Sequence, residues 1–390
     1  MLNGIKYIIV IISVYALSSV ANAQPLTFSD EVDISLLTCS PGKEIWAQYG
    51  HTAIRYNDKL NGNDIAINYG LFSQDQPYFI LRFIFGLTDY KVGAIPMDLF
   101  IEQYKYEGRQ VTEQVLNLTK EEKYKIYKAL NENLKPENTV YRYNFFYDNC
   151  TTRAENIILD NINRNTNISQ LNSSTSNLPT FRNLIHRWNW VDKWDQLGED
   201  ILLGVKADKP VENIKYTRFL PENLKNYFAK IKRNNKQPLV IKTNQLTAKI
   251  FNKESIDKSF LSPIATSIIL FVIGITLTTL QIRYRKLIPL WQNFIIVVTA
   301  AIGILLTAMI FSQHPCVNIN FIICFFNPLP LIILFNKIKQ KKSIVIYKIW
   351  IILIVMGLIG NYFQQIPVFI NLMALFLLYN AVVNIKLSKN

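Results

Sequence analysis

Two short segments of the chain carry residue types that can catalyse acyl transfer. His51 lies in the first segment, Y-G-H-T-A-I-R, and Cys150 lies in the second, F-Y-D-N-C-T-T-R, about a hundred residues later. An imidazole that takes the proton of a thiol makes a nucleophile that attacks carbonyl carbon and forms an acyl-enzyme. If the two side chains meet in the fold, this pair predicts a thiol enzyme.

Cys150 stands where an aromatic, extended segment gives way to a predicted helix over 150–161, whose apolar residues recur at helical spacing. The free N–H groups and partial positive charge at a helix start favour a thiolate and can hold the oxyanion of a tetrahedral intermediate. Asp148 or Asn149 is placed to cap this helix and to fix the geometry around the sulfur. The alternative is a cysteine that serves only as a small buried hydrophobe.

His51 begins a predicted strand over 51–56, directly after a glycine that ends a short helical turn. The turn sequence N-G-N-D at 61–64 predicts a hairpin whose returning strand covers 65–69. In this arrangement the imidazole acts as general base toward the thiol and then as general acid toward the leaving group. Asn68, on the returning strand, is the candidate that orients the imidazole. A purely structural histidine is the alternative.

The other cysteines and histidines allow competing interpretations. The chain has four cysteines, and in an export compartment Cys39 and Cys150 could instead form a structural disulfide. The cysteines and the three histidines show no metal-ligand spacing, so neither a metal nor a cofactor is predicted. His186, in the sequence L-I-H-R-W, is interpreted as structural.

Residues 1–23 predict a secretory signal peptide. Lys6 gives a positive start, residues 7–18 form an apolar core, and A-N-A at 21–23 gives a cleavage site of small residues. Cleavage is expected after Ala23, and an uncleaved membrane anchor is the alternative. In both cases the region that follows is exported.

The last third of the chain predicts a membrane domain at 261–390. Five segments each approach the roughly 20 apolar residues that a helix needs to cross a bilayer. They lie at 261–282, 287–311, 317–335, 344–363 and 367–385. The third segment is the weakest because Asn327, Pro328 and Pro330 interrupt it, and a re-entrant segment is the alternative there.

The charges of the membrane domain predict its topology. Residues 261–390 contain ten lysines or arginines and no acidic residue. The basic residues cluster after the first, third and fifth segments, and positively charged loops stay in the cytoplasm. Five spans place all three clusters, and the C-terminus, in the cytoplasm, whereas a re-entrant third segment would export a lysine cluster and is rejected. Most of the net charge of +14 belongs to this domain and indicates no nucleic-acid partner.

Two further segments are candidates for contact with the membrane surface. His314 lies in the short loop S-Q-H-P-C-V-N at 312–318, which the predicted topology places on the exported side. It could bind a lipid headgroup, line a site from below, or belong to an ordinary polar loop. The apolar segment 77–87 is interpreted either as a buried element or as a segment that rests on the membrane and admits a lipid substrate.

The exported region predicts one α+β domain at 24–207, large enough for a substantial core. Its expected sheet is small and antiparallel, and its elements alternate between strands and helices. Beyond the elements already described, strands are expected at 33–39, 109–118 and 141–146, and helices at 96–106 and 120–134. A polar and basic linker at 208–260 then leads to the first membrane segment.

Longer motifs surround these residues, from residue 34 to about residue 207. They are S-L-L-T-C-S-P-G, W-A-Q-Y-G-H-T-A-I-R-Y, I-N-Y-G-L-F, F-G-L-T-D-Y, F-F-Y-D-N-C-T-T-R, F-R-N-L-I-H and L-L-G-V-K-A-D. The region resembles the Lnb N-terminal periplasmic domain family, and the hydrophobic C-terminal half resembles the membrane part of its full-length members. The resemblance implies a papain-like fold in the circularly permuted NlpC-like arrangement, where the histidine precedes the cysteine, followed by an all-α membrane domain of five helices.

The same resemblance implies a lipoprotein N-acyltransferase with Cys150 as nucleophile and His51 as base. Such an enzyme takes an acyl chain from a phospholipid onto its thiol and passes it to the free α-amine of a lipoprotein's lipidated N-terminal cysteine. It is embedded in the inner membrane, with the thiol domain in the periplasm. Asn68, Asn149 and His314 are the candidate supporting residues.

Two other classes of function are compatible with the same residues. A periplasmic cysteine peptidase or amidase acting on cell-wall peptides is the commoner activity of NlpC-like folds, but a wall hydrolase has no need of a five-span membrane domain. A non-catalytic receptor or assembly factor would keep its function after Cys150→Ser and His51→Ala substitutions.

Overall fold

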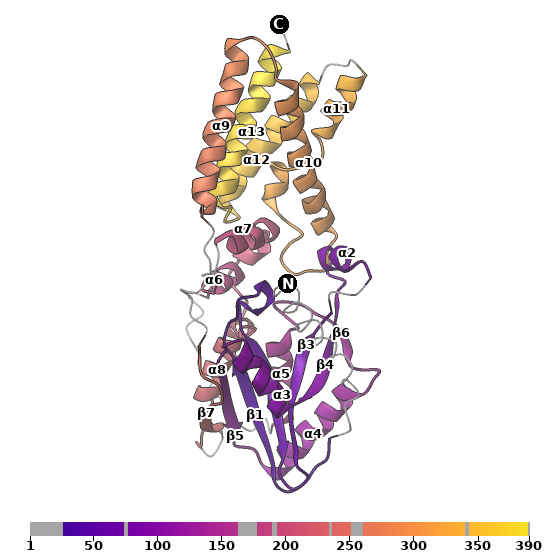
Figure 1. The fold of residues 1–390 in the computed structure, drawn as a ribbon, viewed down its shortest axis with the longest axis vertical. Coiled ribbons are helices and arrows are strands. Elements are labelled where there is room, and N and C mark those ends of the chain that lie inside the picture. Colours follow the sequence, from indigo (N-terminus) through magenta and orange to yellow (C-terminus); the bar gives the residue numbers. More distant parts are fainter. Residues whose placement is uncertain are drawn as a thin grey trace, which may run out of the picture. The chain divides into compact units, whose positions relative to one another are not determined.

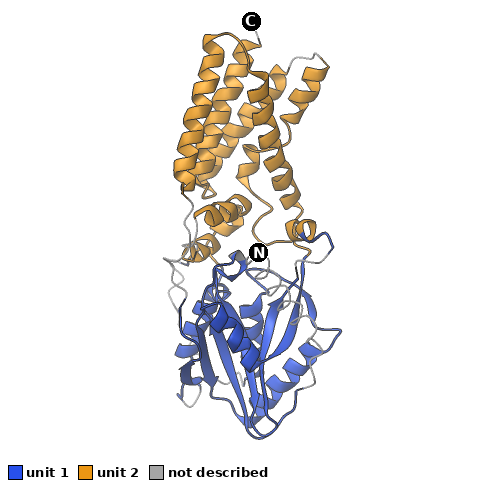
Figure 2. Cartoon of the chain, viewed as in Figure 1, with its two compact units in different colours: residues 1–79, 88–178, 212–256 blue, residues 80–87, 179–211, 257–390 orange. Residues whose placement is uncertain are grey.

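The chain forms two compact units in the computed structural model (Figure 2). Unit 1 comprises residues 1–79, 88–178 and 212–256, and unit 2 comprises residues 80–87, 179–211 and 257–390. The described residues are 26–73, 77–162, 178–188, 193–233, 236–250, 260–339 and 343–388. The predicted signal peptide at 1–23 lies outside the described residues.

Unit 1 contains a seven-stranded antiparallel sheet in the order β6-β4-β3-β2-β1-β5-β7 (Figure 1). The strands are β1 (Val32–Cys39), β2 (His51–Asp58), β3 (Asn63–Leu71), β4 (Asp89–Pro96), β5 (Val111–Leu116), β6 (Val140–Arg142) and β7 (Val240–Gln245). The hairpin that the turn at 61–64 predicts is confirmed, because β2 pairs with β3 from Ala53 to Asp58. β4 and β7 have no counterpart among the predicted strands.

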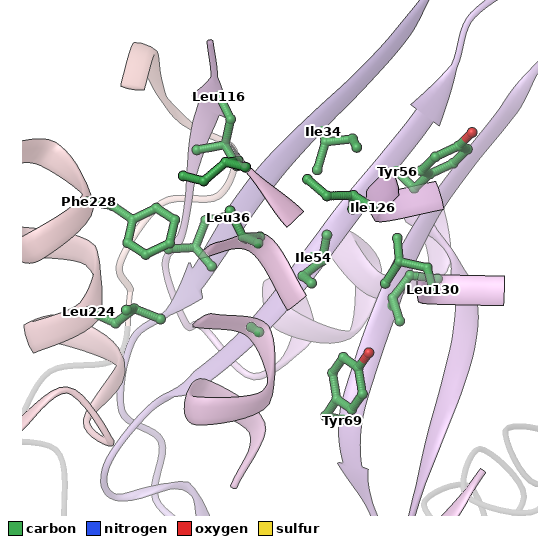
Figure 3. Close-up of a cluster of buried hydrophobic side chains, with 14 of the residues drawn as sticks. Ile34, Leu36, Ile54, Tyr56, Tyr69, Leu116, Ile126, Leu130, Leu224 and Phe228 are labelled. Atoms are coloured by element: carbon green, nitrogen blue, oxygen red, sulfur yellow. The ribbon is translucent and has the colours of Figure 1, made fainter. Parts of the chain in front are cut away.

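One face of the sheet packs against three helices, α4 (Lys120–Leu134), α5 (Cys150–Asn161) and α8 (Pro221–Lys230). Sheet and helices share one buried apolar cluster, and Figure 3 labels Ile34, Leu36, Ile54, Tyr56, Tyr69, Leu116, Ile126, Leu130, Leu224 and Phe228. Burial of one such side chain contributes about 1.5–3 kcal/mol, so this cluster is the main stabilising core of the unit. It holds the N-terminal end of α5 against the sheet.

The opposite face of the sheet packs against α3 (Met97–Tyr106). Phe100 and Tyr104 lie one helical turn apart on α3 and meet the small side chains of Ala53 and Ala66 on the sheet. The alanines leave room for the two rings. Because both faces are covered, the central strands bury apolar residues on both sides.

Residues 221–245 are part of unit 1, although the sequence predicts a polar linker at 208–260. The helix α8 buries Leu224 and Phe228, which are four residues apart and share one face. The strand β7 joins the sheet edge by pairing with β5, and its side chains are mostly exposed. Backbone hydrogen bonds hold such an edge strand in the sheet, so the polar sequence of β7 does not identify it as a strand.

The segment 179–211 of unit 2 contains α6 (Phe181–His186), α7 (Lys193–Leu202) and the 3-10 helix η3 (Val205–Asp208). The fully buried guanidinium of Arg182 donates to the carboxylates of Asp200 and Asp208 and to the carbonyl of Leu203. His186 Nε2 lies 2.8 Å from the same Asp200 carboxylate. Removal of one partner from a buried ion pair is strongly destabilising, so this cluster fixes the segment.

Within the described residues, four helices of unit 2 are long and apolar enough to cross a membrane. They are α9 (Pro263–Arg283), α10 (Pro289–Ile310), α12 (Ile344–Ile359, continued by η7, Gly360–Tyr362) and α13 (Val368–Leu387). Gln292 and Asn380 exchange two hydrogen bonds, of 2.9 and 3.1 Å, between α10 and α13. Asn384 Nδ2 donates to Gln292 at 3.0 Å. Amide pairs of this kind join helices in an apolar environment.

The third predicted span, at 317–335, is not one continuous helix. It contains the 3-10 helix η6 (Phe321–Cys324) and the start of α11 (Leu331–Ile338), with Asn327, Pro328 and Pro330 between them. A Cβ on Gly303 of α10 would come within 2.4 Å of the Asn327 backbone, so the glycine allows the irregular backbone to pack closely. Irregular backbone at membrane depth is tolerated where protein covers it. The count of five spans stays a prediction.

Candidate active site

The beginnings of β2 and α5 meet inside unit 1. Thr52 follows His51 on β2, Thr151 follows Cys150 on α5, and their buried hydroxyl oxygens are 3.1 Å apart. This contact joins residues 99 positions apart in sequence. It places the histidine-bearing strand end beside the cysteine-bearing helix start, which is the encounter that the two motifs require for chemistry.

His51 is held by an amide on the neighbouring strand. Asn68 lies on β3, and its Oδ1 is 2.6 Å from His51 Nε2. An amide oxygen only accepts hydrogen bonds, so Nε2 carries the proton in this arrangement and Nδ1 remains able to take a proton from a thiol. Asn68 is itself buried, with 8 % of its surface exposed, so it holds the ring in place.

Asn149 caps the helix that begins with Cys150. Its Oδ1 accepts hydrogen bonds from the backbone N–H groups of Thr151 and Thr152, both at 2.9 Å, and Thr152 Oγ1 accepts from the Asn149 backbone N–H at 2.8 Å. Its Nδ2 donates to the carbonyl of Phe219, 2.9 Å away. Reciprocal capping of this kind satisfies the free groups of the first turn and fixes the position of the sulfur.

The Cys150 thiol is acidified by the histidine. Burial raises its pKa, but the positive charge of His51 and a hydrogen bond to its ring lower it, as do contacts with the Thr52 backbone and the Thr151 hydroxyl. The balance brings the pKa of Cys150 down from 9.0 to about 7. For His51, burial lowers the pKa, but the Cys150 charge and hydrogen bond and the Asn68 amide raise it above 6.5. A thiolate and an imidazolium therefore stabilise each other at neutral pH.

Cys39 is a free thiol, and no disulfide joins it to Cys150. It is the last residue of β1 and pairs across the strands with His51. Burial raises the pKa of Cys39 to about 12, although the charge of Arg109 and a hydrogen bond to Tyr104 lower it. A thiol with so high a pKa is neutral and unreactive near pH 7.

Tyr143 is a site residue that the sequence does not single out. Its hydroxyl hydrogen-bonds to Cys150, and burial raises its pKa well above 10, so the hydroxyl stays protonated and can donate. The ring stacks on Tyr90 with centroids 4.2 Å apart and lies 3.5 Å from where a Cβ on Gly70 would be. The aromatic run at 141–146 is visible in the sequence, but its spacing does not tell which ring reaches the sulfur.

The contacts of His314, a candidate supporting residue, lie within unit 2. His314 belongs to unit 2, where its Nε2 is 2.5 Å from the carbonyl oxygen of Phe83 and its ring lies 5.3 Å from the ring of Phe83. Burial lowers the pKa of His314, which keeps the imidazole neutral near pH 7. The thiol, imidazole and amide that unit 1 brings together are those of Cys150, His51 and Asn68.

Two family descriptions match the chain. Residues 26–187 match the Lnb N-terminal periplasmic domain, and residues 255–390 match the Lnb transmembrane domain. The chain belongs to the Lnb-type family. Searches of curated proteins and of solved structures found no match. Membership of the Lnb-type family indicates an inner-membrane protein of lipoprotein processing, with a periplasmic domain followed by a transmembrane domain.

Proposed function

We propose that this Lnb-type protein is a thiol acyltransferase that moves an acyl chain from a phospholipid to the N-terminal amine of lipoproteins. The observation that carries the proposal is the meeting of the His51 strand end and the Cys150 helix start inside unit 1, with the imidazole held by Asn68. In this buried site His51 lowers the pKa of Cys150 to about 7. A buried structural cysteine has the opposite shift, as Cys39 does. An acidified thiol beside an oriented imidazole is suited to covalent acyl transfer.

The first step would load the acyl chain on the enzyme. The Cys150 thiolate attacks the carbonyl carbon of a phospholipid ester, and the carbonyl electrons move to oxygen. The Tyr143 hydroxyl and the backbone N–H of Cys150 itself, the first residue of α5, are the donors that the Asn149 cap leaves for that oxyanion. When the intermediate collapses, the C–O bond breaks and His51 gives its proton to the leaving alcohol. The products are a Cys150 thioester and a lysophospholipid.

The second step would transfer the chain to nitrogen. The neutral α-amine of a lipoprotein attacks the thioester carbonyl, and His51 takes the proton that the amine loses. The C–S bond then breaks, Cys150 leaves as a thiolate, and an amide is formed. The thiolate and the imidazolium are restored, so no oxidant, reductant or nucleotide is consumed.

The four long apolar helices favour this reaction over a wall hydrolase. Both the ester donor and the lipidated amine acceptor reside in the bilayer, so an enzyme anchored there meets its two substrates at the same surface. A peptidase or amidase acting on wall peptides would use the same cysteine and histidine. It would gain no substrate from the membrane domain.

The test is to trap the acyl-enzyme. The purified full chain is incubated with phospholipid vesicles without an acceptor, quenched in acid and examined by mass spectrometry. We expect a fatty acyl mass on the peptide containing Cys150 that disappears after hydroxylamine treatment and in Cys150→Ala. Cys39→Ala is the matched control and should still acquire the acyl group. A wild-type chain that turns over lipoprotein while Cys150 never carries an acyl group would contradict the proposal.

A further inference from the structure

The apolar segment around residue 80 belongs to the membrane unit, although it lies in sequence between two strands of the sheet. The helix α2 (Phe79–Ile84) follows β3 and precedes β4, yet residues 80–87 are part of unit 2. None of its residues is buried. A short apolar helix without a buried face contributes little to a protein core, so its composition needs another explanation.

Several contacts fasten this segment to the loop that follows α10. The Ser312 hydroxyl donates to the carbonyl of Ile84 at 2.8 Å, and the Gln313 N–H donates to the carbonyl of Phe85 at 2.9 Å. His314 Nε2 meets the carbonyl of Phe83. Backbone groups at the end of α2 are thus satisfied by the loop rather than by the sheet.

Gly86 allows this attachment to be close. Its φ is +66°, in the left-handed region that favours glycine, and a Cβ there would come within 2.7 Å of the His314 backbone nitrogen. His314 therefore works as a fixed part of an attachment point, together with its neighbours at 312–313. This gives a role to the loop histidine that the sequence leaves open.

The side chains that α2 leaves uncovered are large and apolar. Ile80 is 73 % exposed and Leu81 56 %, and Tyr78, the residue before α2, is 79 % exposed. The attachment loop begins where α10 ends at Ile310, and Phe311, the next residue, is 74 % exposed. The exposed apolar side chains of α2 are thus fastened, through residues 312–314, to the loop that directly follows a helix with the length and composition of a membrane span.

We propose that Tyr78, Ile80 and Leu81 lie in the headgroup region of the outer leaflet, and that phospholipid acyl donors are taken up there. The first part rests only on the attachment of α2 to the end of α10. The second part rests on the proposed acyltransferase function. Its structural support is a row of aromatic rings in unit 1 that starts at Phe79, the first residue of α2.

The aromatic row links Phe79 to the thiol within unit 1. Phe79 stacks on Phe72 with centroids 6.3 Å apart, Phe72 lies 5.1 Å from Tyr90, and Tyr90 lies 4.2 Å from Tyr143. Tyr143 hydrogen-bonds to Cys150. Rigid aromatic faces provide an apolar surface for an acyl chain at little entropic cost. A phospholipid bound at α2 would therefore have its acyl chain next to Phe79, the first ring of this aromatic row.

The membrane contact can be tested without any activity. The photo-reactive residue p-benzoylphenylalanine is introduced as Ile80→p-benzoylphenylalanine in the full chain, which is placed in nanodiscs of phosphatidylethanolamine and phosphatidylglycerol. The matched control is the same substitution at Tyr106, an 84 % exposed ring at the end of α3 in unit 1. After illumination we expect phospholipid adducts at position 80 at least tenfold above those at position 106. Equal adducts at the two positions, or protein adducts alone at position 80, would overturn the proposal.

Uptake is tested by comparing donors in Ile80→Asp. The rate of Cys150 acylation is measured with long-chain phospholipid in nanodiscs and with a short-chain, water-soluble thioester. We expect the ratio of the two rates to fall about tenfold in Ile80→Asp and to stay constant in Leu60→Asp, which changes an exposed apolar side chain in a turn of unit 1. An unchanged ratio in Ile80→Asp overturns the uptake role. Lipid adducts at position 80 in a protein whose Cys150 reacts with neither donor would refute the acyltransferase function and leave the membrane contact standing.

Discussion

Cys39 and Cys150 lie in the same unit and are both buried, yet their surroundings shift their pKa values in opposite directions. At Cys39 the effect of burial prevails and the pKa rises to about 12. At Cys150 the charge and hydrogen bond of His51 outweigh burial, and the pKa falls to about 7. The comparison shows that exclusion from water does not make a thiol reactive. The ring that His51 presents to one sulfur makes the difference.

The largest expected effect comes from removing each thiol in turn. Cys150→Ala should lower acyl transfer by on the order of 1,000-fold or more, because the covalent route is lost, while Cys39→Ala should retain most of the activity. Iodoacetamide at pH 7 should modify Cys150 in the native chain and leave Cys39 unmodified. The measurement is lipoprotein N-terminal acylation together with peptide mapping of the alkylated protein. Equal loss in both variants, with α5 still folded, would remove the distinction between the two cysteines.

The His51→Ala substitution should make Cys150 resemble Cys39. Without the imidazole, burial again prevails and the thiol pKa should rise above 9.0, the ordinary value. A thiolate forms as the pH rises through the pKa, so the midpoint of the alkylation profile should move from about pH 7 to above pH 9. At pH 7 the thiolate fraction then falls from about one half to less than about one hundredth. Alkylation rates measured from pH 5 to pH 10 give both midpoints.

Asn68→Ala is the control for this experiment, because it leaves the imidazole in place and removes only the 2.6 Å contact to Nε2. Its midpoint should move upward by less than that of His51→Ala. A His51→Ala profile that still turns at pH 7 would mean that another group acidifies Cys150.

Local sequence signals are sufficient to predict the strands and the helix that position this site. The turn at 61–64 sets the β2–β3 hairpin, and the hairpin register brings Asn68 to the strand that carries His51. The change from extended to helical pattern at Cys150 likewise marks the start of α5. These are short-range properties, so the chain itself encodes them within a few residues.

Local sequence signals of this kind do not predict contacts between residues that are far apart in the sequence. The approach of Tyr143 to Cys150 depends on how its ring lies against Tyr90 and Gly70, which are far away in sequence. The sequence also attributes the acidity of Cys150 to the helix start, whereas in the structure the charge of His51 is the largest contribution that lowers its pKa. The inertness of Cys39 follows from burial under α3, which no local motif near Cys39 reveals.

The Tyr143→Phe substitution should have an intermediate effect. It keeps the ring that stacks on Tyr90 and removes only the hydroxyl that bonds to Cys150. Loss of one oxyanion donor costs on the order of 100-fold in the acylation rate. Tyr141→Phe is the matched control, because its ring lies in the same aromatic run, 6.2 Å from that of Tyr143. The rate of thioester formation from a water-soluble acyl donor is the measurement, and equal rates in the two variants would exclude an oxyanion role for the hydroxyl.

The smallest expected effects come from substitutions of Asn149, which distinguish the contribution of the helix cap to stability from the effect of a nearby charge on the pKa of Cys150. Asn149→Ala removes a cap that accepts two backbone hydrogen bonds, so it should lower the free energy of unfolding by about 1 kcal/mol and leave the alkylation midpoint near pH 7. Asn149→Asp keeps an accepting oxygen and adds a negative charge, which opposes the thiolate and should raise the midpoint by about one pH unit. Denaturant titration and the pH profile measure the two quantities separately. If Asn149→Ala moved the midpoint as far as His51→Ala does, the helix start rather than the imidazole would be what distinguishes Cys150 from Cys39.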